Sequence, residues 1–95
     1  MASLPPTPAL HFFTRADCEL CDDARAALQA VLEQRARRGD PVPRLQVVDV
    51  DREEELSLRY GARVPVVAIG DQELSLATSA RAIAAFLDRV MGRLA

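Results

Sequence analysis

The feature that most constrains this chain is a pair of cysteines, Cys18 and Cys21, placed where a short apolar run gives way to a helical pattern. They are the only cysteines in the sequence. Residues three positions apart at a helix start lie on one face, close enough for a disulfide to close without remodelling the backbone. Unpaired backbone N–H groups and the helix dipole favour a thiolate there. The spacing predicts a redox dithiol in which Cys18 attacks and Cys21 resolves the mixed disulfide.

A lone CxxC pair can also bind a metal or form a buried structural pair. A structural zinc site needs four ligands, and one chain offers two thiols and a single histidine, His11. We therefore expect no metal site within one chain, although two chains sharing four thiols would supply enough ligands. A buried structural pair is disfavoured because charge crowds the cysteines. The charged neighbours are Asp17, Glu19, Asp22 and Asp23.

Length and composition fit a single domain over residues 1–95, with residues 1–8 as a proline-rich flexible arm. The net charge of −2, with both signs interspersed, predicts neither a nucleic-acid partner nor a membrane partner. We expect the protein to be a monomer. The sequence shows no secretory signal and no apolar run long enough for a bilayer, so we also expect a cytoplasmic location. In that reducing compartment a CxxC pair is more often catalytic or metal-binding than a permanent crosslink.

The first half of the chain predicts a strand, a long helix and a second strand. Apolar runs over residues 9–14 and 45–50 have the length of buried strands. Between them, apolar residues recur at helical spacing from residue 19 until Gly39 ends the helix. Asp17 stands where the N-cap of this helix is expected. Together these elements predict a β-α-β unit.

The second half predicts a short helix, two strands and a last helix. Asp51 is expected to cap the short helix and Asp49 to end the strand before it, so we do not interpret these carboxylates as a metal site. The apolar run over residues 64–69 and the alternating residues 73–76 predict an antiparallel hairpin. Ser79 opens the last helix, whose apolar stripe is assigned to the core.

This order, β-α-β-α-β-β-α with the CxxC pair after the first strand, is the layout of the thioredoxin fold, an α/β fold with a four-stranded mixed sheet and helices on both faces. The chain resembles the glutaredoxin-like branch of the thioredoxin superfamily. The resemblance rests on residues 12–14 with 18–21, residues 48–51, and residues 59–65. It implies that Pro65 is the cis-proline found beside the cysteines in these proteins, and that the backbone of Val64 pairs with a bound substrate.

The resemblance also implies a function. It is that of a thiol–disulfide oxidoreductase in cell redox homeostasis, without a bound cofactor, acting on a disulfide-bearing protein or with glutathione as co-substrate. By resemblance, Tyr60 lines the substrate groove. The residues expected to contact substrate are Leu20, Val64, Pro65, Thr78 and Ser79.

Three departures from the glutaredoxin pattern argue against strong glutathione binding. Glu19 and Leu20 replace the usual Pro-Tyr, Asp17 stands where a basic residue is expected, and residues 76–79 replace the glycine pair and aspartate that hold glutathione. The acidic surroundings predict a Cys18 thiol less reactive than that of a typical glutaredoxin, and they should repel glutathione. These departures favour, as the alternative function, a redox-sensing or protein-interaction module with little turnover.

Overall fold

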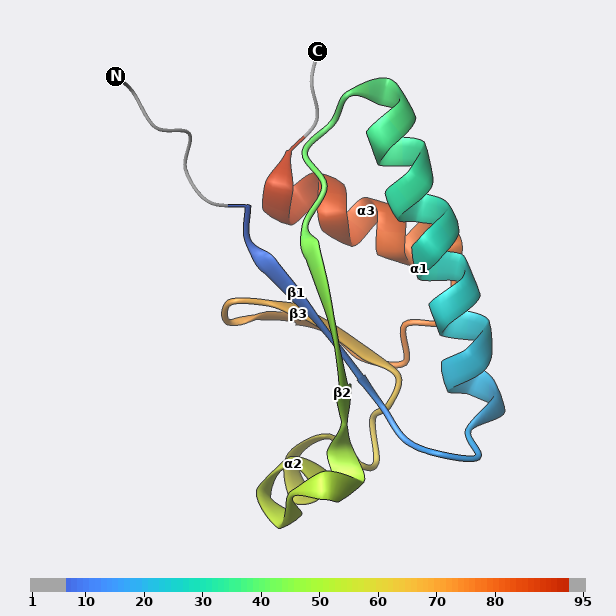
Figure 1. Ribbon diagram of the computed structural model, residues 1–95, viewed down its shortest axis with the longest axis vertical. Coiled ribbons are helices and arrows are strands. Elements are labelled where there is room, and N and C mark those ends of the chain that lie inside the picture. The colour runs from blue at the N-terminus through green and yellow to red at the C-terminus, as the bar shows by residue number, and fades with distance from the viewer. Residues whose placement is uncertain (1–6, 93–95) are drawn as a thin grey trace.

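Four strands form one mixed sheet in the computed structural model, which describes residues 7–92. They are β1 (Ala9–Thr14), β2 (Arg44–Asp49), β3 (Val66–Ile69) and β4 (Gln72–Leu74), in the spatial order β2-β1-β3-β4. β1 and β2 are parallel, and the other two pairs are antiparallel. The helices are α1 (Glu19–Arg38), α2 (Glu54–Tyr60) and α3 (Ala80–Met91), with a 3₁₀ turn, η1 (Val50–Arg52), before α2. This confirms the predicted α/β thioredoxin fold (Figure 1).

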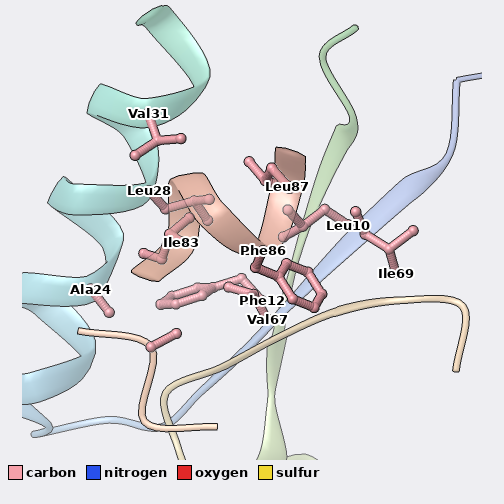
Figure 2. Close-up of a cluster of buried hydrophobic side chains, with 11 residues drawn as sticks. Leu10, Phe12, Ala24, Leu28, Val31, Val67, Ile69, Ile83, Phe86 and Leu87 are labelled. Carbon is pink, nitrogen blue, oxygen red and sulfur yellow. The ribbon is translucent and has the colours of Figure 1, made fainter. Parts of the chain in front are cut away.

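The central strand β1 separates two cores because its side chains alternate between the two faces of the sheet. Leu10 and Phe12 belong to the larger core. That core also contains residues of α1 and α3, two helices that pack against each other. Figure 2 shows Leu28 of α1 and Phe86 of α3 gathered with Phe12 in this core. None of the helices within residues 7–92 has the length and apolar character needed to cross a membrane.

The smaller core lies on the opposite face, where α2 packs. Phe13 of β1, Val66 of β3 and Tyr60 at the end of α2 are buried there. Cys21 belongs to the same cluster, whereas Ala24, the next buried residue of α1, belongs to the larger core. The first turn of α1 therefore connects the CxxC pair to the face of the sheet that α2 covers.

The start of α1 differs from the prediction in its capping residue. Cys18, rather than Asp17, is the N-cap, and its Sγ accepts a hydrogen bond from the Cys21 N–H at 3.1 Å. An N-cap residue needs an extended backbone, which Cys18 has, whereas Asp17 has a left-handed φ of 55°. The end of α1 is as predicted, because Gly39 adopts the left-handed conformation that closes a helix.

The prediction that Asp51 caps the short helix is wrong. Asp49 caps η1 instead, accepting the N–H of Asp51 at 2.9 Å, and α2 begins only at Glu54. A 3₁₀ turn directly before a helix carries the same acidic, cap-like signal as the helix itself, so the sequence pattern placed the start too early. The side chain of Asp51 pairs with Arg15.

The predicted antiparallel hairpin is present with shifted strand ends, because its strands span residues 66–69 and 72–74 rather than 64–69 and 73–76, and the last helix starts as predicted. β3 and β4 pair through a turn in which Gly70 has a φ of 60°. The hydroxyl of Ser79 accepts the N–H of Ala82 at 3.2 Å and so caps α3. β3 begins at Val66, so Val64 and Pro65 form the segment that leads into it.

The expected arm over residues 1–8 lies mostly outside the described residues. The last two of its residues, Thr7 and Pro8, are described, and their carbonyls accept hydrogen bonds from Arg44 of β2 at 3.1 and 2.9 Å. These two residues are therefore fixed to the edge of the sheet rather than part of a loose arm.

A buried arginine joins the ends of α1 and α3. Arg35 is 1% exposed, and its guanidinium donates to the Asp88 carboxylate at 2.9 Å. It also donates to the carbonyls of Pro41 and Gly92, at 2.7 and 2.6 Å. A charged group taken out of water needs such partners, so we assign Arg35 a structural role.

Candidate active site

Cys18 and Cys21 form a disulfide across the start of α1, with Cα atoms 5.2 Å apart. Cys18 is partly exposed, whereas Cys21 is 2% exposed and packs in the smaller core. The Sγ of Cys18 also receives the backbone N–H of Cys21. The two sulfurs are therefore unequal, because an external thiol or disulfide can approach Cys18 more easily than Cys21.

The segment that leads into β3 packs in the same cluster as both cysteines. Val64 is buried there, and the Val64–Pro65 peptide bond is cis, as the resemblance implied. The carbonyls of Arg63 and Pro65 accept the N–H groups of Leu76 and Ala77, at 3.1 and 2.8 Å. Among the residues that the structure describes, no hydrogen bond engages the peptide N–H or C=O of Val64.

Two exposed leucines stand at this surface. Leu20, between the cysteines, is 53% exposed, and Leu76, whose N–H bonds to Arg63 beside Val64, is 58% exposed. Leu76 has a φ of 51°, a conformation that L residues other than Asn and Asp rarely adopt. The sequence analysis did not identify Leu76, because the alternating pattern extended the strand past its actual end at Leu74.

Thr78 and Ser79 precede α3. The Thr78 N–H donates to the Leu76 carbonyl at 2.8 Å, and the Ser79 hydroxyl caps the helix. Both groups thus already have partners within the chain, and a role of these residues in substrate binding stays a prediction.

Exposed carboxylates surround the CxxC pair. Negative charges oppose the thiolate that the N-terminus of a helix favours. The basic Arg25 lies two turns farther along α1, roughly 10 Å from Cys18 at the rise of a helix. The four acidic residues are Asp17, Glu19, Asp22 and Asp23.

The other nearby cation, Arg15, is bound elsewhere. Its Nη2 and Nε donate to the two carboxylate oxygens of Asp51 at 2.7 and 3.2 Å, and its Nη1 donates to the Gly61 carbonyl at 3.1 Å. The hydrogen bond from Arg15 lowers the pKa of Asp51, and the same bond raises the pKa of Arg15. Both groups are therefore charged at neutral pH, and the charge of Arg15 is compensated by Asp51 rather than by a thiolate at Cys18.

The Arg15–Asp51 pair was not predicted from the sequence, although the predicted parallel strands were enough to indicate it. Thr14 and Asp49 are register partners at the ends of the parallel strands β1 and β2. Residues that follow two such strand ends emerge at the same edge of the sheet. A prediction of parallel strands therefore brings Arg15 and Asp51 together.

Tyr60 lies behind the site, because it is buried and stacks on Phe13 with ring centroids 3.9 Å apart. Its hydroxyl donates to Glu73 at 2.9 Å, and Arg59 and Arg63 lie over its ring. Burial raises the pKa of Tyr60, and the bond to Glu73 adds to this effect. Burial alone would raise the pKa of Glu73, but hydrogen bonds from Tyr60 and Arg63 outweigh it and lower that pKa. Tyr60 therefore belongs to the buried packing behind the cysteines rather than to the exposed surface of the site.

Other features of residues 7–92 give no second site. Within this range, no three His, Cys, Asp or Glu side chains are arranged to hold a metal ion. His11 stacks beside Phe13, with ring centroids 6.0 Å apart. An open pocket of 420 Å³ between β2 and α2 contains none of the predicted site residues. Its lining consists of Val47, Val48, Asp49, Arg52, Glu53 and Leu56.

Comparison with known proteins agrees with this geometry. A family model described as a glutaredoxin-like domain (DUF836) matches residues 9–89. The X-ray structure of a structural-genomics target protein from X. campestris is 33% identical, with a TM-score of 0.67 over 86% of this chain and 99% of that one. No curated protein matches the chain.

Two less similar structures share the fold alone. A malarial protein is 16% identical, with a TM-score of 0.64 over 88% of this chain and 97% of that one. The solution structure of a protein from Nitrosomonas europaea is 24% identical, with a TM-score of 0.55 over 79% of this chain and 81% of that one.

Proposed function

Because the chain belongs to the glutaredoxin-like domain family, we propose that it is a thiol–disulfide oxidoreductase whose redox centre is the pair Cys18 and Cys21. The observation that supports this most is the inequality of the two sulfurs. Cys18 is partly exposed at the N-cap of α1, and Cys21 is buried behind it. An accessible sulfur at a helix N-terminus suits a nucleophile, and a protected neighbour three residues later suits a resolving thiol.

The proposed reaction is a two-step exchange. The Cys18 thiolate attacks one sulfur of a substrate disulfide, so that a Cys18–substrate bond forms and the other substrate sulfur leaves as a thiolate. Cys21 then loses its proton and attacks the Cys18 Sγ, which releases the second substrate thiolate and forms the Cys18–Cys21 disulfide. The substrate gains two electrons that the protein loses. Two thiol equivalents, from a dithiol protein or from two glutathione molecules, reduce the protein again.

The surroundings of Cys18 supply groups for each part of this exchange. The N-terminus of α1 and the Cys21 N–H stabilise negative charge on the Cys18 Sγ. The N–H and C=O of Val64, beside Pro65, can pair with an extended substrate backbone, as when a peptide adds a strand to a sheet edge. Leu20 offers apolar contact, and Thr78 and Ser79 at the start of α3 are the proposed contacts for a substrate carboxylate. In this proposal the protein acts as a cytoplasmic monomer without a bound cofactor.

A redox-sensing or interaction module is the second candidate. It is favoured by the carboxylates around Cys18, because they lower the fraction of thiolate available for turnover. Such a module would form and lose the disulfide, and a partner would bind one redox state, but the rate of disulfide reduction would stay near that of the uncatalysed reaction.

Single-cysteine variants and a small neutral disulfide test the proposal. With bis(2-hydroxyethyl) disulfide as substrate and dithiothreitol as reductant, the wild type should accelerate reduction and Cys18→Ser should not. With the same disulfide and no reductant, Cys21→Ser should accumulate a mixed disulfide on Cys18, detected by intact mass. The proposal fails if the Cys18→Ser variant forms the adduct on Cys21 as fast. Disulfide formation in the wild type without acceleration would favour the sensor.

A further inference from the structure

We propose that the charges around Cys18 select its partner, so that a cysteine on a basic protein segment reacts in preference to an anionic thiol such as glutathione. We further propose that Asp51 enforces this preference by holding Arg15. The inference rests on the proposed redox function of Cys18 and names the substrate class of that same site.

The first step of the argument is the charge that an approaching thiol meets. Four exposed carboxylates stand within five residues of Cys18 along the chain. An attacking thiolate carries negative charge, and glutathione adds a further net negative charge because its two carboxylates outnumber its one ammonium. Like charges across an encounter surface slow association, and opposite charges accelerate it. A lysine or arginine next to the partner cysteine therefore offsets the repulsion that an anionic thiol would meet in full.

The second step is the pairing of the cation that lies nearest to Cys18 along the chain. Arg15 lies three residues before Cys18, but Asp51 binds it through both carboxylate oxygens and the Gly61 carbonyl takes a further N–H. Arg25, two turns along α1, lies about one Debye length away at physiological ionic strength. Asp51 thus neutralises the one described cation that directly precedes the CxxC pair, although Asp51 itself comes from η1, 36 residues away.

The third step is the shape of the surface between the charges. Leu20 follows Glu19 in the chain, the Leu76 N–H bonds to the Arg63 carbonyl beside Val64, and both leucines are more than half exposed. Lysine and arginine side chains pack their aliphatic stems on apolar surface while the charged end stays in water. An extended basic segment can therefore contact both leucines, pair with the Val64 peptide groups and place its cation near Glu19.

The test measures how fast thiols of different charge open the Cys18–Cys21 disulfide. The probes carry beside the thiol a cationic group (cysteamine), a neutral group (2-mercaptoethanol) or an anionic group (3-mercaptopropionate and glutathione), and each rate is expressed per thiolate. For every probe the rate with Asp51→Asn is divided by the wild-type rate, so that intrinsic differences between the thiols cancel. The ratio should be about two to five for the two anionic thiols, the size expected for one exposed charge pair. It should be smaller, but still above one, for 2-mercaptoethanol, whose thiolate carries a single negative charge. It should be near one for cysteamine, whose ammonium offsets the charge of its thiolate.

Two further variants show that Arg15 is the cause. Adding Arg15→Gln to Asp51→Asn should remove the gain with anionic thiols, because the released cation is then gone. Asp22→Asn should shift the ratios in the same direction as Asp51→Asn, because it removes a carboxylate beside Cys18 and leaves the Arg15–Asp51 pair intact. If Asp51→Asn does not fold, Asp22→Asn takes its place in the test. Glu33→Gln, on α1 but far from Cys18, is the control and should leave all ratios near one. Salt at about 1 M should reduce every charge effect.

Equal ratios for all four thiols, or a gain that survives Arg15→Gln, would overturn the inference. If no thiol opens the disulfide, or if the reduced protein reduces no disulfide, the proposed redox function itself fails. The two failures are distinguishable, because the first leaves the reaction intact and removes only its dependence on charge.

Discussion

The rings of Phe13 and Tyr60 stack with centroids 3.9 Å apart and planes 13° from parallel. This contact joins the end of α2 to the central strand, in the cluster that also contains Cys21. The bond from the Tyr60 hydroxyl to Glu73 adds a second tie, to β4. One side chain therefore connects three elements beneath the CxxC pair.

We expect the stack to matter more for stability than the hydroxyl does. Tyr60→Ala should lower the free energy of unfolding by about 3–5 kcal/mol, the usual cost of removing a buried aromatic ring. Tyr60→Phe keeps the stack and should cost about 0.5–1.5 kcal/mol for the lost hydrogen bond. Urea unfolding followed by circular dichroism measures both. Equal losses for the two variants would show that the hydroxyl, and not the ring, holds α2 in place.

The lowered pKa of Glu73 predicts a specific loss of stability in acid. Its pKa is lower in the folded protein than in the unfolded protein, where a glutamate has a pKa of about 4.3. The carboxylate therefore stabilises the fold above that pH, and this contribution is lost as the pH falls through the lower, folded pKa. Glu73→Gln should flatten the stability profile between about pH 5 and pH 3. An unchanged profile would mean that Glu73 titrates alike in both states.

Short-range patterns predicted most of the fold. β1 occupies the predicted residues 9–14, because the apolar run is bounded by Pro8 and Arg15. The sites that were mispredicted, at Asp17 and Asp51, are helix starts, where several polar residues in a row could each serve as the cap. The choice between them depends on backbone φ, which the sequence does not show.

The long-range ion pairs were not predicted from the sequence. Arg35 has the pattern of an exposed helix residue, and its burial follows from how α3 crosses the end of α1. By contrast, the contact between Cys18 and Cys21 was predicted, because both residues lie in one helical turn. The Arg15–Asp51 pair needed the register of two strands as well.

The buried Arg35 provides a matched comparison on one helix. Arg35→Met removes the pair with Asp88 and leaves two carbonyls without their donor, so we expect a loss of roughly 1–3 kcal/mol. Arg37→Met, at a residue with an 81% exposed side chain, should change stability by less than about 0.5 kcal/mol. Chemical denaturation of both variants measures the difference. Similar small losses would contradict the structural role of Arg35.

We expect Leu76 to lower the stability of the fold and to contribute to the reduction of protein disulfides. Its left-handed φ of 51° costs a leucine roughly 1–2 kcal/mol, and its side chain is mostly exposed, so Leu76→Gly should not destabilise the fold. The same variant should reduce a protein disulfide more slowly, while its rate with bis(2-hydroxyethyl) disulfide is unchanged. Destabilisation by more than about 1 kcal/mol would instead indicate that Leu76 serves packing.

The most direct test of the redox assignment is the equilibrium of the wild-type protein in a series of glutathione redox buffers, with intact mass reporting the Cys18–Cys21 disulfide. We predict one reversible two-electron transition in the range of roughly −200 to −270 mV spanned by glutaredoxins and thioredoxins. A pair that stays oxidised or stays reduced across the whole series would contradict a redox dithiol and leave the cysteines a structural role.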